Sequence, residues 1–188
     1  MASTTALTPV QANARLHELT VVDVRTPGEY ASGHLPGAHN VPLDHLDAAL
    51  PALRAAADRG GLLLVCASGA RSAQASRRLA EQDIAAATLT GGTTAWTRLG
   101  HDTHRPVGAR TPWAMDRQVR LAAGSLVLTG LLAGRRRSAA RRLSAGVAGG
   151  LVLSALTNTC GMAAILAKLP HNQPRATDLE DTLAALTG

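Results

Sequence analysis

The run Leu62–Val65 constrains the fold of this chain most strongly, because it is short and apolar at every position. Gly60-Gly61 precedes it, and a loop of small residues follows it. Such a run is typical of a strand that helices cover on both faces of a parallel sheet. Weaker strand patterns occur at residues 21–24, 38–41 and 86–89. They alternate with helical patterns, so the sequence predicts an α/β fold with a mostly parallel sheet flanked by helices.

The helices expected between these strands begin and end at recognisable residues. Thr8-Pro9 is a typical helix start, and this helix is expected to end near Glu18. Leucines at positions 43, 46, 50 and 53 have helical spacing, which predicts a helix over residues 43–58. Two further helices are expected over residues 72–82 and 93–99. Gly33, Pro36 and Gly37 indicate turns between the first two strands.

Cys66 directly follows the predicted strand 62–65 and begins a loop that enters a helix. Ligands of open parallel sheets bind at the carboxyl ends of the strands. Backbone N–H groups at a helix start favour an anion, so we expect Cys66 to be held as the thiolate. Arg71 supplies a positive charge and a planar fork suited to oxyanions. The candidate nucleophile is Cys66, and the candidate substrate-binding residues are Ala67, Ser68, Gly69, Ala70, Arg71 and Ser72.

Four motifs in order resemble those of the rhodanese family. Cys66 and Arg71 match its active loop of Cys, four residues and Arg. Residues 22–25 (VDVR) resemble the strand that ends in Asp-x-Arg, and residues 29–38 (EYASGHLPGA) resemble the motif E-[YF]-x-x-G-H-[IL]-P-G-A. Residues 91–96 (GGTTAW) resemble the signature G-G-x-x-A-W. The resemblance covers about residues 8–98 and implies a sulfurtransferase that carries sulfur as a persulfide on Cys66.

Loop length separates this chemistry from that of related enzymes. Dual-specificity phosphatases and arsenate reductases place five residues between Cys and Arg, which makes room for a tetrahedral phosphate. Four residues fit a single transferred sulfur atom. Arg25 is a possible secondary contact to substrate, although a buried ion pair with Asp23 is the more common role for such a residue.

Cofactors and metals are not expected in this chain. The two cysteines, Cys66 and Cys160, lie in segments of different character, and no CxxC motif or Cys/His cluster indicates a metal site. A disulfide between them is not expected. Cys160 is a possible second sulfur-handling residue, but it lies in an apolar run, where a small packing residue is the simpler interpretation.

The C-terminal part of the chain carries the whole net charge of +6. Its basic residues flank two uncharged runs, Leu121–Gly134 and Leu143–Ala167, and aromatic residues are only 2% of the chain. Flanking charge of this kind favours a membrane over a nucleic acid as the partner. The second run is long enough to span a bilayer, whereas the first reaches only about 21 Å as a helix. A hairpin packed on the first domain, or a soluble dimerisation module, is the alternative.

This second part resembles the membrane domain of YgaP-like inner-membrane rhodaneses. The resemblance lies in Trp113 to Arg120, in Cys160 with the residues after it, and in Leu169 to Asn172. It implies two transmembrane helices, contact with lipid and a homodimer formed through those helices. Five arginines at 135–142 lie between the two runs and favour a cytoplasmic position for that loop, so a re-entrant hairpin stays open as an alternative.

The predicted organisation follows from these parts. We expect a rhodanese domain at 1–105, a linker at 106–114, a transmembrane hairpin at 115–172 and a polar tail at 173–188. The N-terminal residues lack the pattern of a secretory signal, so the rhodanese domain is expected on the cytoplasmic side of the bacterial inner membrane.

The predicted function is sulfur transfer from a small anionic donor, such as thiosulfate, through a Cys66 persulfide to cyanide or a thiol. Two alternatives stay open. The chain could be a persulfide carrier or redox sensor that a partner protein reads, or an oligomer could transport a sulfur species. No nucleic-acid partner is expected.

Overall fold

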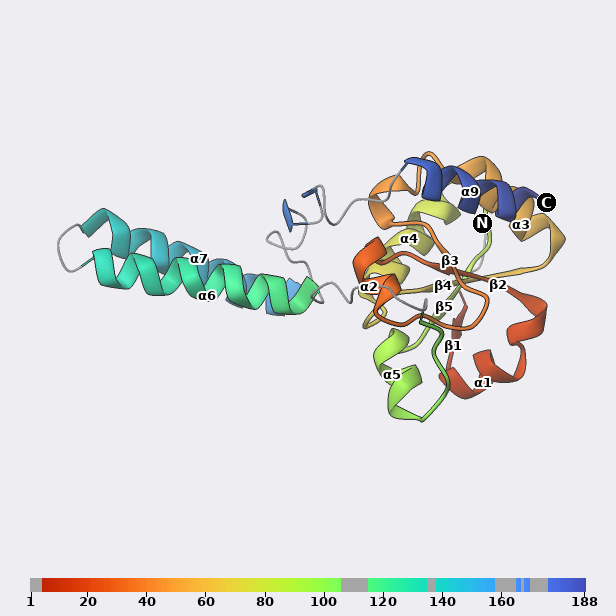
Figure 1. The fold of residues 1–188 in the computed structure, drawn as a ribbon, viewed down its shortest axis with the longest axis horizontal. Helices are drawn as coiled ribbons and strands as arrows, with labels where there is room; N and C mark the ends of the chain where they lie inside the picture. The colour runs from red at the N-terminus through yellow and green to blue at the C-terminus, as the bar shows by residue number, and fades with distance from the viewer. Residues whose placement is uncertain (1–4, 106–114, 135–137, 158–164, 167, 170–175) are drawn as a thin grey trace. The chain divides into compact units, whose positions relative to one another are not determined.

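A computed structural model describes residues 5–105, 115–134, 138–157, 165–166, 168–169 and 176–188. The chain forms two compact units (Figure 1). The first comprises residues 1–112 and 174–188, and the second comprises residues 113–173. The predicted linker 106–114 and Cys160 lie outside the described residues.

The first unit is built on a five-stranded sheet in the order β1-β5-β4-β2-β3. All four neighbouring pairs are parallel, which confirms the predicted fold class. The apolar strand β4 lies in the middle, so the residue that follows it leaves the sheet at its centre. The strands are β1 (Ala6–Leu7), β2 (Leu19–Asp23), β3 (His39–Asn40), β4 (Gly61–Val65) and β5 (Ala87–Leu89).

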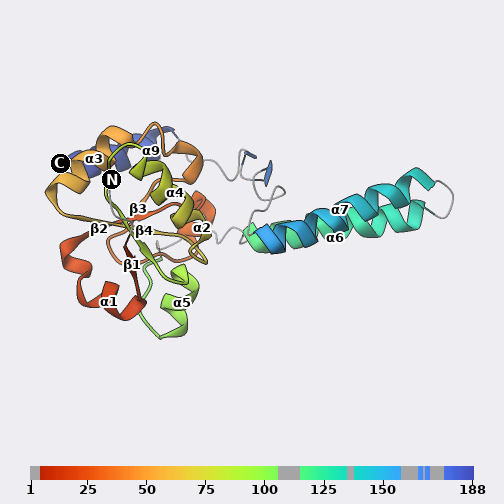
Figure 2. The same ribbon diagram turned by 180° about the vertical axis from the view of Figure 1, so that it is seen from behind.

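Helices cover both faces of this sheet, as the two views show (Figures 1 and 2). Two of them begin with a threonine capping box followed by proline, at Thr8 and at Thr26. This local signal fixes both helix starts. The threonine side-chain oxygen accepts a hydrogen bond from a backbone N–H in the first turn, and proline has no N–H that would need a partner there. The helices are α1 (Pro9–Ala14), α2 (Pro27–Ala31), α3 (Leu50–Arg59), α4 (Ala70–Ala80), α5 (Gly92–Arg98) and α9 (Ala176–Thr187), with short 3-10 turns η1 (Leu16–Glu18) and η2 (Leu43–His45).

The predicted helix 43–58 is wrong in its first part. Residues 43–45 form the turn η2, and α3 begins only at Leu50. Pro51 lies in the first turn of α3, where its missing N–H is tolerated. Within a longer helix, Pro51 could not donate a hydrogen bond to the carbonyl one turn before it, so the helix cannot extend back to residue 43. Helix α2 lies in the segment for which only turns were predicted.

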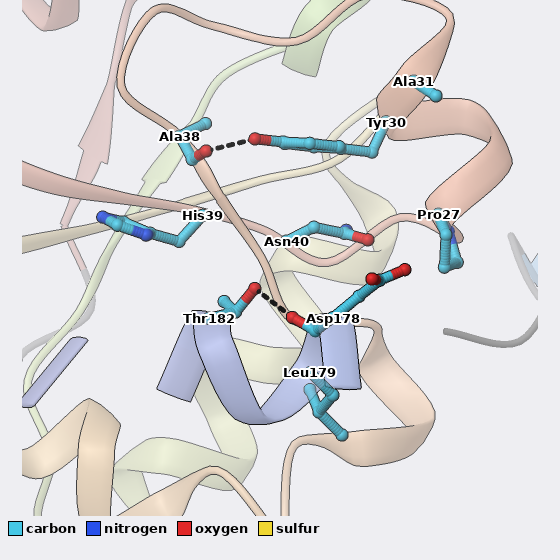
Figure 3. Close-up of a pocket in the computed structure, with 9 residues that line it drawn as sticks. All are labelled: Pro27, Tyr30, Ala31, Ala38, His39, Asn40, Asp178, Leu179 and Thr182. Atoms are coloured by element: carbon cyan, nitrogen blue, oxygen red, sulfur yellow. Dashed lines mark hydrogen bonds between the residues drawn. The ribbon is translucent and has the colours of Figure 1, made fainter. Parts of the chain in front are cut away.

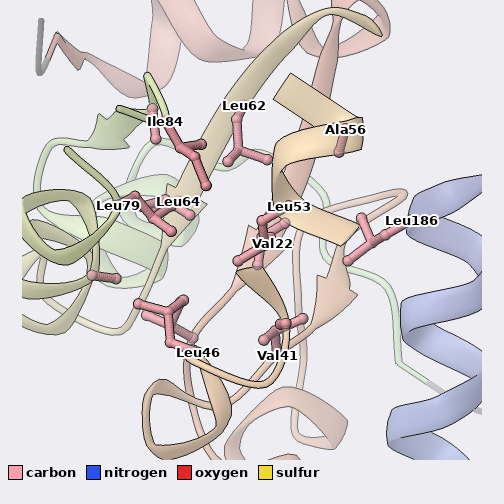
Figure 4. Close-up of a cluster of buried hydrophobic side chains, with 14 of the residues drawn as sticks. Val22, Val41, Leu46, Leu53, Ala56, Leu62, Leu64, Leu79, Ile84 and Leu186 are labelled. Carbon is pink, nitrogen blue, oxygen red and sulfur yellow. The ribbon is translucent and has the colours of Figure 1, made fainter. Parts of the chain in front are cut away.

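Alternate side chains of the strands build two hydrophobic cores. Val22, Leu62 and Leu64 point to the side of α3 and α4, and part of this cluster is drawn in Figure 4. Val21, Leu63 and Val65 belong to the cluster on the side of α1 and α5, with Trp96. Because β4 buries side chains on both faces, it holds the loop after it on a rigid base.

The segment 173–188 is not only the polar tail that was predicted. Residues 176–187 form α9, which packs on α3 within the first unit. Leu186 is 1% exposed and belongs to the same core as Leu53 and Ala56 (Figure 4). The Arg59 side chain donates to the carbonyls of Leu186 and Thr187 at the end of α9. Glu180 and Asp181 are exposed, and such charged residues give the segment a polar composition although Leu186 is buried.

The second unit contains two helices that pack against each other, α6 (Met115–Ala133) and α7 (Ser138–Thr157). Ser144 is buried and donates to the carbonyl oxygen of Val127 at 3.1 Å, which joins the two helices. Leucines on the outer surface, including Leu128 and Leu132, are more than half exposed. Within the described segments, neither helix is both long enough and apolar enough to cross a membrane.

Candidate active site

The Cys66 sulfur lies in a cradle of backbone N–H groups at the end of β4. The residue is 1% exposed. The N–H of Gly69 donates to Sγ at 3.1 Å, and the N–H of Ser72 donates to it at 3.4 Å. Two donors aimed at one sulfur stabilise a negative charge there. This is the arrangement that the position of Cys66 between strand and helix predicted.

The loop closes on itself through Gly69 and Ser72. Gly69 has φ +101°, a conformation that side chains disfavour, and it is the N-cap of α4. The Ser72 hydroxyl donates to the carbonyl oxygen of Gly69 at 3.0 Å and lies 3.6 Å from the Cys66 sulfur. Ser72 is fully buried, whereas Ser68 is exposed at the loop surface. Helix α4 therefore begins within the loop, two residues earlier than predicted.

A second segment supports the loop from β5 and α5. The N–H groups of Thr93 and Thr94 donate to the carbonyls of Cys66 at 2.8 Å and Ala67 at 3.0 Å. Gly92 makes this approach possible, because a Cβ there would lie 2.2 Å from the Cys66 carbonyl oxygen. The GGTTAW motif was recognised by resemblance, but its contact with the cysteine loop was not predicted.

Arg71 is held by a carboxylate from a different helix. Its Nη1 and Nη2 atoms donate to the two oxygens of Glu29 at 2.8 and 2.7 Å. The Glu29 side chain is 8% exposed and that of Arg71 is 30% exposed. Both terminal nitrogens of Arg71 are thus directed at α2. The sequence suggested that this fork binds substrate. In the structure it binds Glu29, and the role of Arg71 toward substrate stays a prediction.

Protonation of the pair follows from its contacts. Burial alone would raise the pKa of the Glu29 carboxyl, but the hydrogen bonds and charge of Arg71, with hydrogen bonds from Thr26, lower that pKa below its usual value. Burial acts on the Arg71 guanidinium in the opposite sense, and Glu29 and Cys66 nevertheless raise its pKa. Both groups are therefore charged at neutral pH.

The predicted secondary residue Arg25 is part of a buried brace. Its Nε and Nη2 atoms donate to the Asp23 carboxylate at 2.6–2.9 Å, and Nη2 also donates to the carbonyl of Gly33 at 2.8 Å. The Asn40 amide donates to the carbonyls of Asp23 and Arg25, each at 2.9 Å. Arg25 is 5% exposed. The network therefore fixes the loop between β2 and α2, and Glu29 belongs to α2.

A separate pocket of about 370 Å³ lies between α9 and the segment from α2 to β3 (Figure 3). Tyr30 and Asn40 line one side, and Asp178 and Thr182 of α9 line the other. The Tyr30 hydroxyl donates to the Ala38 carbonyl. Because no residue of the loop 66–72 lines this pocket, it is distinct from the cysteine site.

The described residues contain no cluster of side chains suited to a metal ion.

Comparison with known proteins gives the class of this chain. Residues 8–99 match the rhodanese-like domain family. A sulfurtransferase of Allochromatium vinosum is 33% identical over 99 residues, which cover 52% of this chain and 90% of that protein. The crystal structure of a rhodanese-related protein from Thermoplasma volcanium shares the fold, with a TM-score of 0.50 and 24% identity over 53% of this chain and 97% of that one.

The second unit has its own match. Residues 114–175 match the transmembrane domain of inner membrane proteins like YgaP. An uncharacterised protein of Synechocystis is 37% identical over 155 residues, which cover 81% of this chain and 84% of that protein. The chain therefore belongs to the rhodanese family, in its YgaP-like form with a C-terminal transmembrane-type domain. Helix α9 begins at Ala176, beyond both matched regions.

Proposed function

We propose that the chain is a membrane-anchored sulfurtransferase whose nucleophile is Cys66. In the first step the Cys66 thiolate attacks the sulfane sulfur of a donor such as thiosulfate. A bond forms between Sγ and that sulfur, the S–S bond of the donor breaks, and its electron pair leaves with sulfite. In the second step cyanide or a thiol attacks the outer sulfur of the persulfide and restores the Cys66 thiolate. The two steps make ping-pong kinetics the expected behaviour.

The observation that carries this proposal is the cradle around the Cys66 sulfur. In the thiolate, which attacks in the first step and is restored in the second, the negative charge lies on Sγ, and the N–H groups of Gly69 and Ser72 are already aimed at that atom. Preformed donors stabilise such intermediates without reorganisation during the reaction. The rhodanese-like match and the relative named sulfurtransferase support the same chemistry.

Membrane attachment is proposed for residues 113–173. The match to a transmembrane domain family supports it, as do the exposed leucines on the outer surface of α6. A bilayer or a second copy of the hairpin could cover these leucines, and we propose a homodimer in the inner membrane. We place the rhodanese unit on the cytoplasmic side, where Cys66 stays reduced.

The test uses the full chain purified in a non-ionic detergent. The protein is incubated with thiosulfate and cyanide, and thiocyanate is measured beside a Cys66→Ala variant. We expect many turnovers per chain and none in the variant. If wild-type protein releases at most one thiocyanate per chain, the transferase proposal fails and a persulfide carrier replaces it. If Cys66→Ala is as active as the wild type, Cys66 is not the nucleophile.

A further inference from the structure

We propose that this site prefers, as sulfur donor, a thiol persulfide with no more than one negative charge over the thiosulfate dianion. The inference rests on the proposed function and concerns the charge of the donor. It follows from the electrostatics of the loop, which differ from what its sequence suggests. The motif provides one arginine for an anionic donor, and the fold neutralises that arginine.

The neutralisation is direct. Both terminal nitrogens of Arg71 donate to the Glu29 carboxylate, at 2.7 and 2.8 Å, and the carboxylate is almost completely buried. A donor that bound the edge of the Arg71 guanidinium that faces Glu29 would have to displace a buried, well-bonded carboxylate. Leaving such a carboxylate without its partner is strongly unfavourable. The Arg71 fork therefore positions the loop, and its charge is already compensated when the donor arrives.

The charges that act directly on Arg71 do not leave a positive site. Glu29, Cys66 and Asp23 all act on the Arg71 guanidinium. Asp23 is in turn paired with Arg25, whose Nη2 atom lies 2.6 Å from its carboxylate. With Cys66 as the thiolate, these five groups carry three negative and two positive charges, so the cluster has a net charge of −1.

The rest of the loop adds no cation. Residues 67–70 are Ala, Ser, Gly and Ala. The backbone N–H groups of Gly69 and Ser72, which would otherwise attract an anion, already donate to the Cys66 sulfur. They stabilise the thiolate charge on Sγ. An incoming dianion thus meets a compact site of its own sign.

The two donors differ in how much of that repulsion they meet. Thiosulfate brings two negative charges to the thiolate and leaves as sulfite. A thiol persulfide, R–S–SH, is neutral or singly charged. The thiolate attacks its outer sulfur, the Sγ–S bond forms, the R–S bond to that sulfur breaks, and the electron pair leaves as R–S⁻. Like charges repel in proportion to their product, so the repulsion is at least twice as strong for thiosulfate.

The salt dependence of the rate constant measures the product of the donor charge and the site charge, and it does not depend on the intrinsic reactivity of either donor. The second-order rate constant for loading Cys66 is measured in non-ionic detergent between about 20 and 500 mM salt, with thiosulfate and with 2-hydroxyethyl persulfide. For the wild type we expect the thiosulfate constant to rise about fourfold as salt screens the repulsion, and the persulfide constant to rise about twofold or less. A thiosulfate constant that falls with salt would show a site with usable positive charge and would overturn the inference.

A pair of variants tests the same point by adding a charge. Ser68 is exposed on the loop, so Ser68→Lys places a cation there, and Ser68→Gln is the uncharged control of similar length. At low salt we expect the ratio of the thiosulfate constant to the persulfide constant to be about three to ten times higher in Ser68→Lys than in Ser68→Gln. Equal ratios in the two variants would contradict the inference.

These outcomes are distinct from failure of the proposed function. If neither donor loads Cys66, the transferase proposal itself is wrong, and if the Cys66→Ala variant turns over, Cys66 is not the nucleophile. If thiosulfate loads Cys66 with a rate that falls with salt, the transferase stands and only the donor preference is wrong.

Discussion

Gly92 should be indispensable for catalysis although it contributes no functional group. In Gly92→Ala the new Cβ would lie 2.2 Å from the carbonyl oxygen of Cys66 and 2.6 Å from that of Ala67. Both neighbours are backbone atoms of the active loop, so no side chain can rotate away. The loop or α5 must move, and the hydrogen bond from the Thr93 N–H to the Cys66 carbonyl must lengthen from 2.8 Å.

The size of the effect follows from the clash. Real Cβ atoms essentially never lie closer than 3.0 Å to such an atom, and ordinary contacts are 3.4–4 Å long, so the loop has to shift by roughly 1 Å. A misplacement of about 1 Å at a reacting group lowers rates by about 100-fold. We therefore expect the rate constant for persulfide formation on Cys66 to fall by about 100-fold in Gly92→Ala. The assay is single-turnover loading of Cys66, with the fluorescence of the buried Trp96 as a check of folding.

Gly100→Ala is the matched control. Gly100 also has a positive φ, +78° against +58° for Gly92, but a Cβ there would meet nothing within 4 Å. Both variants carry the strain of a side chain at positive φ, about 1–2 kcal/mol. Only Gly92→Ala adds the clash. If folded Gly92→Ala loads Cys66 within threefold of Gly100→Ala, the reasoning that Gly92 sets the loop position is refuted.

Three further predictions concern the supports of the site. Leu186→Ala should lower the free energy of unfolding of the first unit by about 2–3 kcal/mol, because it leaves a cavity at a buried position under α3. Denaturant titration measures this change. Ala185→Ser, at an exposed position, is the control and should change the free energy of unfolding by less than about 0.5 kcal/mol. Arg71→Lys should destabilise the unit by roughly 1–2 kcal/mol and slow loading of Cys66, since lysine keeps the charge but loses the fork that binds both Glu29 oxygens; unchanged stability would contradict this. The folded pKa of Glu29 is lowered, so its contribution to stability is complete above its unfolded pKa, near 4.5, and is lost as pH falls through the folded pKa. Melting temperatures from pH 7 to pH 3 should fall less steeply in Glu29→Gln than in the wild type, and parallel curves would contradict the assignment.

The sequence predicted what depends on local pattern. The apolar run of β4 and the small residues after it were sufficient to place Cys66 between a strand buried on both faces and a helix start. The threonine and proline at the start of α1 have the same local character. Helix α2 carries an equal signal at Thr26 and Pro27, but the glycines and prolines that follow it indicate turns and mask that signal.

The contacts that define the site chemically are not local. Glu29 and Arg71 are 42 residues apart, and nothing in either segment indicates that their charges cancel. Gly92 reaches Cys66 only because β5 lies beside β4 in the sheet. For both contacts, strand order decides which residues meet, and strand order is not a property of any single segment.

The position of α9 also has a consequence for the order in which this protein is made. Arg59 and Thr187, which join α3 to α9, are 128 residues apart, and the whole hairpin unit is translated between them. At about 5–20 residues per second, α9 leaves the ribosome roughly 6 to 25 seconds after α3. The core beneath α3 therefore lacks Leu186 until the hairpin and α9 have been synthesised. Final packing of the first unit can therefore follow only after the hairpin and α9 have been translated.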